Sequence, residues 1–174
     1  MRSRPLTDDD EIDPRRPRPR KDARGYFMLP QSTAGAGYYT YGMLDGMPDK
    51  GAYQYPHPTM MTAIFRVAFE WQAMDNRRFG VGNISLPGGR RHPDHASHMN
   101  GLQVDIRPMR KDGREAAVTW MDSQYDQAGT ATLIELFRTF ALATRIFFNG
   151  HGIPFVTPMQ HHDDHFHVEL RAQP

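Results

Sequence analysis

The sequence contains no cysteine, no hydrophobic stretch long enough to cross a membrane, and almost no net charge. Without cysteine there are no disulfides, thiolate metal ligands or cysteine nucleophiles, so a metal site must use histidine and carboxylate side chains. No segment approaches the roughly 20 consecutive apolar residues that a membrane-spanning helix needs, and we expect no membrane insertion. A net charge of +1 gives no whole-chain field that attracts nucleic acid, so none is expected as a partner.

Apolar residues are also scarce in the first 25 positions. This segment holds eight Arg or Lys, six Asp or Glu and four Pro residues. Such a composition cannot bury enough apolar surface to offset the entropy of ordering, so it predicts a disordered charged leader over residues 1–25. It lacks the apolar core of a secretory signal peptide, so we expect no signal peptide and synthesis in the cytoplasm. Residues 26–174 have a length typical of a single domain.

Hydrophobic periodicity predicts two helices in this domain. The first covers residues 59–75, with Thr59 as its N-cap. The second begins near Thr132, which forms a capping box with Glu135. The segment 43–57 is rich in Gly, Pro and Asp and is predicted to be a loop.

Short strands are predicted between and after these helices. Helices and strands are interleaved without a regular βαβ rhythm, which favours an α+β fold. We expect a small, mostly antiparallel sheet flanked by helices, in a loop-rich protein. The predicted strands lie within residues 35–42, 80–86, 101–106, 145–150 and 165–170.

Seven of the nine histidines lie in two short segments, "HPDHASHMNGLQVD" (92–105) and "HHDDHFHVEL" (161–170). In a strand, successive side chains alternate between faces. In the second segment, His165 and His167 would therefore share the polar face. In the first, Asp105 would lie on the polar face of an otherwise apolar strand, where a buried carboxylate needs a cation.

These positions favour a metal site on the polar face of the sheet. His98 precedes the strand of Asp105, and Gly101 between them allows a turn. His98, Asp105 and one of the two strand histidines would leave a fourth position open, as in catalytic zinc sites. Non-haem iron enzymes use the same ligand types, usually with a His-x-Asp triplet from one strand, but no such triplet here includes Asp105, so zinc is the expected metal. Either segment alone would also fit exposed histidines on a solvent-facing strand.

Three segments together carry a resemblance to a known family. "GVGNISLPGG", "HASHMNGLQVDI" and "HHDDHFHVEL" resemble the penicillin-insensitive murein endopeptidases, within the wider group of lysostaphin-type, D-Ala-D-Ala and hedgehog-like zinc peptidases. The group is marked by His-x6-Asp followed much later by His-x-His. The resemblance covers about residues 38–170.

The resemblance implies a role for individual residues. It makes His98, Asp105 and His167 the ligands of one zinc ion per chain. His165 would be the catalytic histidine beside the open coordination position, and His162 a further active-site histidine.

Four more residues concern the edge of this site. His95 matches a family position near the metal that can join a second metal site. Gln103 stands where the family usually has an acidic residue, so we expect one metal rather than two. Asp163 and Asp164 are candidates for fixing imidazole tautomers, or for forming a turn before the last strand.

The resemblance also implies an activity. It is that of a zinc-dependent hydrolase that cleaves the peptide cross-link between peptidoglycan stem peptides, as a murein D,D-endopeptidase does. Two alternatives stay open: a D,D-carboxypeptidase or dipeptidase acting on soluble wall peptides, and a non-catalytic zinc-binding module. We expect a monomer that binds stem peptides and acts on the cell wall in the periplasm after release or delivery, as a phage lysin or an antibacterial effector would.

Overall fold

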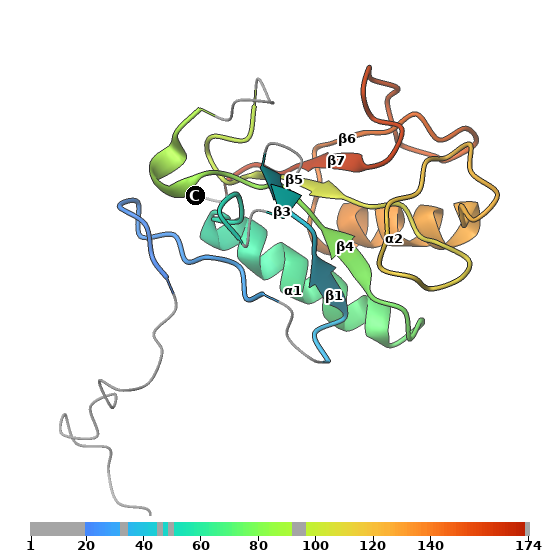
Figure 1. Ribbon diagram of the computed structural model, residues 1–174, viewed down its shortest axis with the longest axis horizontal. Coiled ribbons are helices and arrows are strands. Elements are labelled where there is room, and N and C mark those ends of the chain that lie inside the picture. The colour runs from blue at the N-terminus through green and yellow to red at the C-terminus, as the bar shows by residue number, and fades with distance from the viewer. Residues whose placement is uncertain (1–19, 32–34, 45–46, 49–50, 92–96, 173–174) are drawn as a thin grey trace, which may run out of the picture.

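Two helices and a five-stranded sheet form the domain in the computed structural model, which describes residues 20–31, 35–44, 47–48, 51–91 and 97–172 (Figure 1). The two strands β2 (Met43–Leu44) and β3 (Met47–Pro48) pair with each other outside the main sheet, within the segment expected to be a loop. A single 3-10 turn covers Pro87–Gly89. None of the helices in the described ranges has the length and apolarity that a membrane span requires.

The main sheet is mixed, which corrects the expectation of a mostly antiparallel one. Strand β1 runs parallel to β4, whereas the other three pairings are antiparallel. The chain passes through a helix between β1 and β4, and a crossover of this kind returns the chain in the parallel direction. The α+β class is confirmed. In sheet order, the strands are β1 (Tyr38–Thr40), β4 (Phe79–Val81), β5 (Gln103–Ile106), β7 (Phe166–Glu169) and β6 (Arg145–Phe147).

Helix α1 (Pro58–Gln72) begins one residue earlier than expected and has a different cap. The Nδ1 atom of His57 accepts a hydrogen bond from the backbone N–H of Thr59 at 3.1 Å, so His57 rather than Thr59 is the N-cap. Pro58 occupies the first helical position, where its fixed φ fits and its missing N–H is not needed. The His57 imidazole therefore caps the helix, where the sequence pattern predicted the Thr59 hydroxyl.

Helix α2 (Gln127–Phe140) begins well before the expected Thr132. Asp126 is its N-cap and accepts a hydrogen bond from the Gly129 N–H at 3.0 Å. The Thr132 hydroxyl instead donates to the Ala128 carbonyl inside the helix. Asp126 also forms an ion pair with Arg77 at 2.8 Å, which holds the start of the helix at Asp126. The local capping box at Thr132 and Glu135 gave no indication of this tertiary contact.

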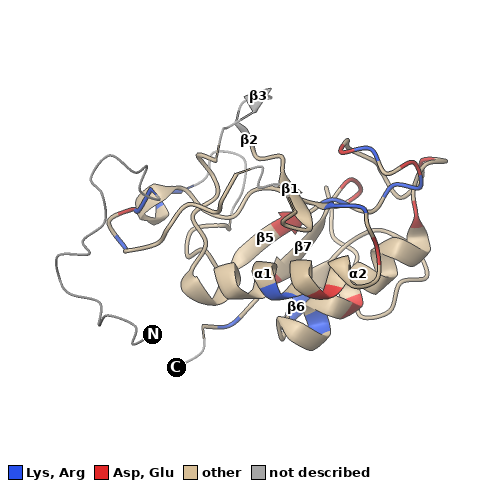
Figure 2. Ribbon diagram, turned by 90° about the horizontal axis from the view of Figure 1, so that it is seen from below, with Lys and Arg blue, Asp and Glu red and all other residues tan. Residues whose placement is uncertain are grey.

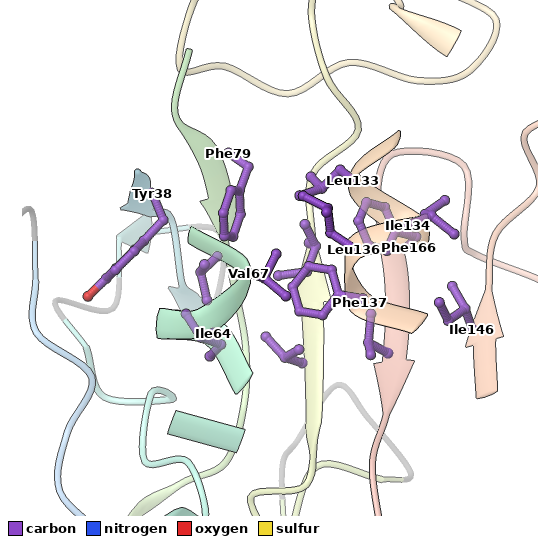
Figure 3. Packing of buried hydrophobic residues seen from close by; sticks show 14 of the residues in the cluster. Tyr38, Ile64, Val67, Phe79, Leu133, Ile134, Leu136, Phe137, Ile146 and Phe166 are labelled. Carbon is purple, nitrogen blue, oxygen red and sulfur yellow. The ribbon is translucent and has the colours of Figure 1, made fainter. Parts of the chain in front are cut away.

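Both helices pack on one face of the sheet, where they lie in front of the strands in Figure 2. The apolar sides of α1 and α2 meet Phe79 of β4, Phe166 of β7 and Ile146 of β6 (Figure 3). Because strand side chains alternate, this arrangement leaves the other face of the sheet for polar residues. The labelled helix residues in this core are Ile64, Val67, Leu133, Ile134, Leu136 and Phe137.

Most of the expected leader, residues 1–19, lies outside the described residues. Residues 20–25, which that expectation also included, instead form a turn against the domain, and Lys21 pairs with Phe27 in an isolated antiparallel bridge. The Asp22 side chain in this turn is only 1% exposed. Composition alone could not predict this, because the partners of the turn are more than sixty residues away.

Candidate metal centre

Asp105 and His167 face each other across two neighbouring strands. In the antiparallel pairing of β5 with β7, Asp105 lies directly opposite His167. Residues on either side of them, such as Ile106 and Phe166, are fully buried in the core. The alternation predicted from the sequence is therefore correct, and it turns both polar side chains to the face that the helices leave free.

His98 reaches the same place from the loop before β5. Gly101 turns this loop with φ 75°, and a Cβ there would come 2.5 Å from the backbone nitrogen of His57, so only glycine fits. The His98 ring places Nδ1 3.0 Å from the Ile84 carbonyl oxygen. Because a carbonyl can only accept, Nδ1 carries a proton and Nε2 is left to face the β5–β7 pair.

Three nitrogen and oxygen atoms converge at this point. His98 Nε2 lies 3.1 Å from His167 Nδ1 and 3.3 Å from Asp105 Oδ1. His167 Nδ1 lies 3.0 Å from the same carboxylate oxygen. The three residues are 0%, 5% and 4% exposed, in the order His98, His167 and Asp105. They form a cluster of the kind that can hold a metal ion.

The spacing of these atoms fits zinc. Zinc binds imidazole nitrogen and carboxylate oxygen at about 2.0–2.1 Å, so neighbouring ligands of a tetrahedral ion lie roughly 3.3 Å apart. The observed separations are 3.0–3.3 Å. The bond from His98 to the Ile84 carbonyl is also the outer contact that metal-binding histidines usually make, because it fixes the tautomer and the ring orientation. The residues present therefore suit the metal that the sequence suggested.

The electrostatics of the cluster favour a bound cation. Burial raises the pKa of Asp105, but the charge of His98 and the hydrogen bonds to His167 and His98 outweigh it, so the pKa lies well below its usual value. Burial lowers the pKa of His98, but the Asp105 carboxylate outweighs it and the pKa is raised. Both shifts show a buried negative charge that attracts positive charge from its neighbours.

His165 lies beside the three residues rather than among them. Its Nε2 atom is 3.8 Å from Asp105 Oδ1, and its Nδ1 atom is 2.9 Å from Asp164 Oδ1. Burial lowers the pKa of His165, but the hydrogen bond to Asp164 and the charge of Asp105 raise it by more, so the net shift is upward. Asp164 thus fixes this ring with Nε2 directed toward the site.

His162 closes the site on one side. Its ring centroid lies 4.8 Å from that of His165 and 5.8 Å from that of His167. Phe147 of β6 contacts His162 with a centroid distance of 5.8 Å. The Nδ1 atom of His162 lies 2.9 Å from the Gln160 carbonyl oxygen, and burial lowers the pKa of His162, which favours the neutral form of the ring.

The two aspartates before β7 have different roles. Asp164 accepts a hydrogen bond from the His165 imidazole, a contact that corresponds to one of the two roles proposed for it. Asp163 does not: its Oδ1 atom accepts hydrogen bonds from Trp120 Nε1 and Asn149 Nδ2, both at 2.9 Å. It therefore ties the loop of Trp120 to the end of β6, next to the site.

The remaining histidines of the two segments, and His151, are placed as follows. His92 and His95 lie outside the described residues, so the expectation for His95 stays a prediction. His161 is exposed and has a φ of 67°, in the turn that leads to His162. His151 contacts Trp120 edge to face, with ring centroids 4.5 Å apart.

The sequence did not predict the contacts that two polar residues, Gln103 and Glu169, make beside the cluster. Gln103 accepts a hydrogen bond from the His98 N–H at 2.6 Å and donates to Glu169 Oε1 at 3.2 Å. The same Glu169 oxygen lies 3.6 Å from His167 Nε2. The signal was present, because strand alternation places Gln103 and Glu169 on the face of Asp105 and His167. What the sequence lacked was the register that puts them opposite each other.

The turn at residues 20–25 holds the loops on both sides of His98. The guanidinium of Arg24 donates to the Met99 carbonyl at 2.7 Å, to the Leu86 carbonyl at 2.9 Å and to the Ser85 hydroxyl at 3.0 Å. Met99 follows His98, and Ser85 follows the residue whose carbonyl orients the His98 ring. Arg24 thus connects the backbone next to His98 to the backbone next to Ile84, whose carbonyl orients the His98 ring.

Replacing Arg24 with alanine is expected to destabilise the protein by about 2 kcal/mol, because it leaves partly buried acceptors without a charged donor. Zinc affinity should also fall, since His98 loses its support. Urea unfolding and a chelator competition measure the two effects. The matched control is Arg78→Ala, which breaks an exposed pair with Glu115 and should cost less than about 1 kcal/mol. Equal losses in both variants would contradict this role for Arg24.

Asp22 provides the corresponding pH dependence. Burial raises its pKa, but hydrogen bonds from the Gly88 N–H and from Arg24 and Tyr26 lower it by more, so the folded-state pKa lies below the unfolded value of about 4. The ionised group therefore stabilises the fold above about pH 4, and this contribution is lost as the pH falls through the folded-state pKa. In chelator, the stability difference between wild type and Asp22→Asn should shrink on acidification below pH 4. A stability difference between the two proteins that does not change with pH would contradict this role for Asp22.

Comparison with known proteins finds similarity to one family. The model of the family described as penicillin-insensitive murein endopeptidase matches residues 43–149, which include His98 and Asp105 and end before β7. A protein of Haemophilus influenzae named penicillin-insensitive murein endopeptidase is 30% identical over 177 residues. That alignment covers 77% of this chain and 62% of the relative, so the chain spans less than two thirds of the relative's length.

Proposed function

This chain belongs to the penicillin-insensitive murein endopeptidase family, and from that membership we propose that it is a zinc-dependent hydrolase of bacterial peptidoglycan. The bond it cleaves is a peptide cross-link between stem peptides. The observation that carries the proposal is the convergence of His98, Asp105 and His167, with ligand atoms 3.0–3.3 Å apart. The substrate lies in the cell wall, so the protein acts there after release or delivery.

His98, Asp105 and His167 would hold the zinc ion. When bound, zinc would supply Lewis acidity that polarises a carbonyl group and lowers the pKa of water toward about 7. The chain's contribution is to fix these ligands in a buried place. The Ile84 carbonyl and the Gln103 amide hold the His98 side chain and backbone, respectively.

His165 would carry the proton in this reaction. Its Nδ1–H is held by Asp164, so Nε2 is available to accept a proton from the attacking water or to donate a hydrogen bond to the developing oxyanion. His162 packs against this ring and restricts its orientation. Asp163 fixes Trp120 and Asn149 next to this site.

The test is digestion of purified peptidoglycan with mass spectrometry of the products. The wild type should convert cross-linked muropeptides to monomers, a chelator should stop the reaction, and added zinc should restore it. Metal analysis of the protein as purified should find one zinc per chain.

Other products would support the alternatives. Release of terminal D-alanine with cross-links intact would indicate a D,D-carboxypeptidase. Stoichiometric zinc without any cleavage would indicate a zinc-binding module, and bound iron in place of zinc would contradict the proposed metal. Each of these results would overturn the endopeptidase proposal.

A further inference from the structure

Two tyrosine rings cover two glycines on the site face of the sheet. Tyr39 of β1 lies over Gly80 of β4, where a Cβ atom would come 2.8 Å from the tyrosine ring. Tyr41 lies over Gly82, where a Cβ atom would come 2.5 Å from the ring. Only glycine at both positions lets the rings lie flat against the strand. The rings form a shelf beside Asp105, whose charge contributes to the raised pKa of Tyr41.

Arg107 lies on this shelf. It is two residues after Asp105, so its side chain extends from the same face of the chain, and its backbone N–H donates to the Gly80 carbonyl at 3.0 Å. The guanidinium carbon is 3.9 Å from the centroid of the Tyr41 ring and 6.0 Å from that of Tyr39. These are cation–π contacts, which hold the guanidinium plane without using its hydrogen-bonding edge on an acid.

Arg107 has no carboxylate partner among the described residues. Within the described ranges, every other lysine or arginine that makes no ion pair there is exposed. Arg107 also makes no ion pair there, but it is half-buried. Asp164 is close enough for the charge of Arg107 to contribute to the lowering of its pKa, but its carboxylate is bonded to His165. A partly desolvated guanidinium on an aromatic shelf is suited to bind an external carboxylate through two parallel hydrogen bonds.

We propose that Arg107 binds a carboxylate of the peptide substrate and thereby selects stem peptides that carry a free acid next to the scissile bond. This inference rests on the proposed hydrolase function. Side chains two residues apart on one strand face are about 7 Å apart, so a peptide held at the metal centre presents a group within one or two residues to Arg107.

The test uses two synthetic cross-linked peptides with the same scissile bond. The carboxylates that flank the bond are free in one peptide and amidated in the other. For the wild type, kcat/KM should be roughly tenfold to a hundredfold higher for the free acid, the range expected for a charge-assisted hydrogen bond. Arg107→Gln should cleave both peptides at the wild-type rate for the amide. Arg114→Gln, which removes a charge from a side chain that is 79% exposed, should keep the preference, and zinc affinity should be the same in all three proteins.

Three results would overturn the inference: no preference in the wild type, a preference that persists in Arg107→Gln, or an equal loss on both peptides in that variant. If the wild type cleaves neither peptide, the hydrolase proposal fails separately. The role of Arg107 is then tested by equilibrium binding of the two peptides to the zinc-loaded protein. The wild type should bind the free acid roughly tenfold to a hundredfold more tightly than the amide, and equal affinities would refute the proposed role of Arg107.

Discussion

Replacing Asp105 with asparagine is expected to release the metal ion and to abolish hydrolysis, although the two side chains have nearly the same shape. Asp105 is the one carboxylate among the three proposed ligands, and its Oδ1 atom lies 3.0 Å from His167 Nδ1 and 3.3 Å from His98 Nε2. Even the outer contacts of a metal ligand are typically worth 10- to 100-fold in affinity, so loss of a direct ligand should weaken zinc binding by more than about a hundredfold.

A companion variant and a control sharpen this prediction. His98→Ala should show the same loss, because it removes a second ligand and leaves the Ile84 carbonyl without its donor. His161→Asn should bind zinc and cleave peptidoglycan like the wild type, since His161 is exposed and asparagine tolerates its φ of 67°. Metal analysis, chelator competition and product analysis are measured on all four proteins.

Thermal unfolding separates loss of metal from loss of fold. A ligand that binds the folded state raises its stability, so zinc should raise the unfolding midpoint of the wild type and of His161→Asn. It should leave the midpoint of Asp105→Asn unchanged, at a value near that of the chelated wild type. Tight zinc binding by Asp105→Asn, together with normal cleavage, would show that the metal is held elsewhere.

The cluster of His98, Asp105 and His167 was predictable because its signal is local. A carboxylate within an apolar strand and two histidines spaced for one strand face are visible in a few residues each. Alternation then places Asp105 and His167 on polar faces without knowledge of the fold. The pairing of β5 with β7 was not visible, because it joins residues 62 positions apart, and Glu169 was overlooked for that reason.

The errors share a physical cause. At the start of α2, two capping signals compete within a few residues, and the ion pair of Asp126 with Arg77, from 49 positions away, decides between them. The parallel pairing of β1 depends on where α1 returns the chain, which a three-residue strand does not indicate. Arg24 lies in a segment whose composition is typical of disordered chains. Its guanidinium nevertheless donates to acceptors more than sixty residues away in the sequence, and these bonds order the turn.

Replacing His165 with glutamine is expected to lower kcat by about 10²- to 10⁴-fold while zinc stays bound. His165 Nε2 lies 3.8 Å from Asp105 Oδ1, outside the 3.0–3.3 Å spacing of the three proposed ligands, which is why we propose a proton-transfer role for this ring and not a ligand role. Glutamine keeps a polar side chain of similar reach, but it cannot exchange a proton at neutral pH.

Comparison with the variants of the proposed ligands distinguishes a proton-transfer role of His165 from a ligand role. Asp105→Asn should lose metal and activity together, whereas His165→Gln should lose turnover alone, with zinc affinity and unfolding midpoint close to wild type. Asp164→Asn should fall between, because asparagine can still accept the hydrogen bond from His165 Nδ1 but no longer carries the charge that holds the ring. If His165→Gln loses zinc as Asp105→Asn does, His165 is a ligand. If it turns over like the wild type, the proton carrier must be sought elsewhere, with His162 next, because its ring lies 4.8 Å from that of His165.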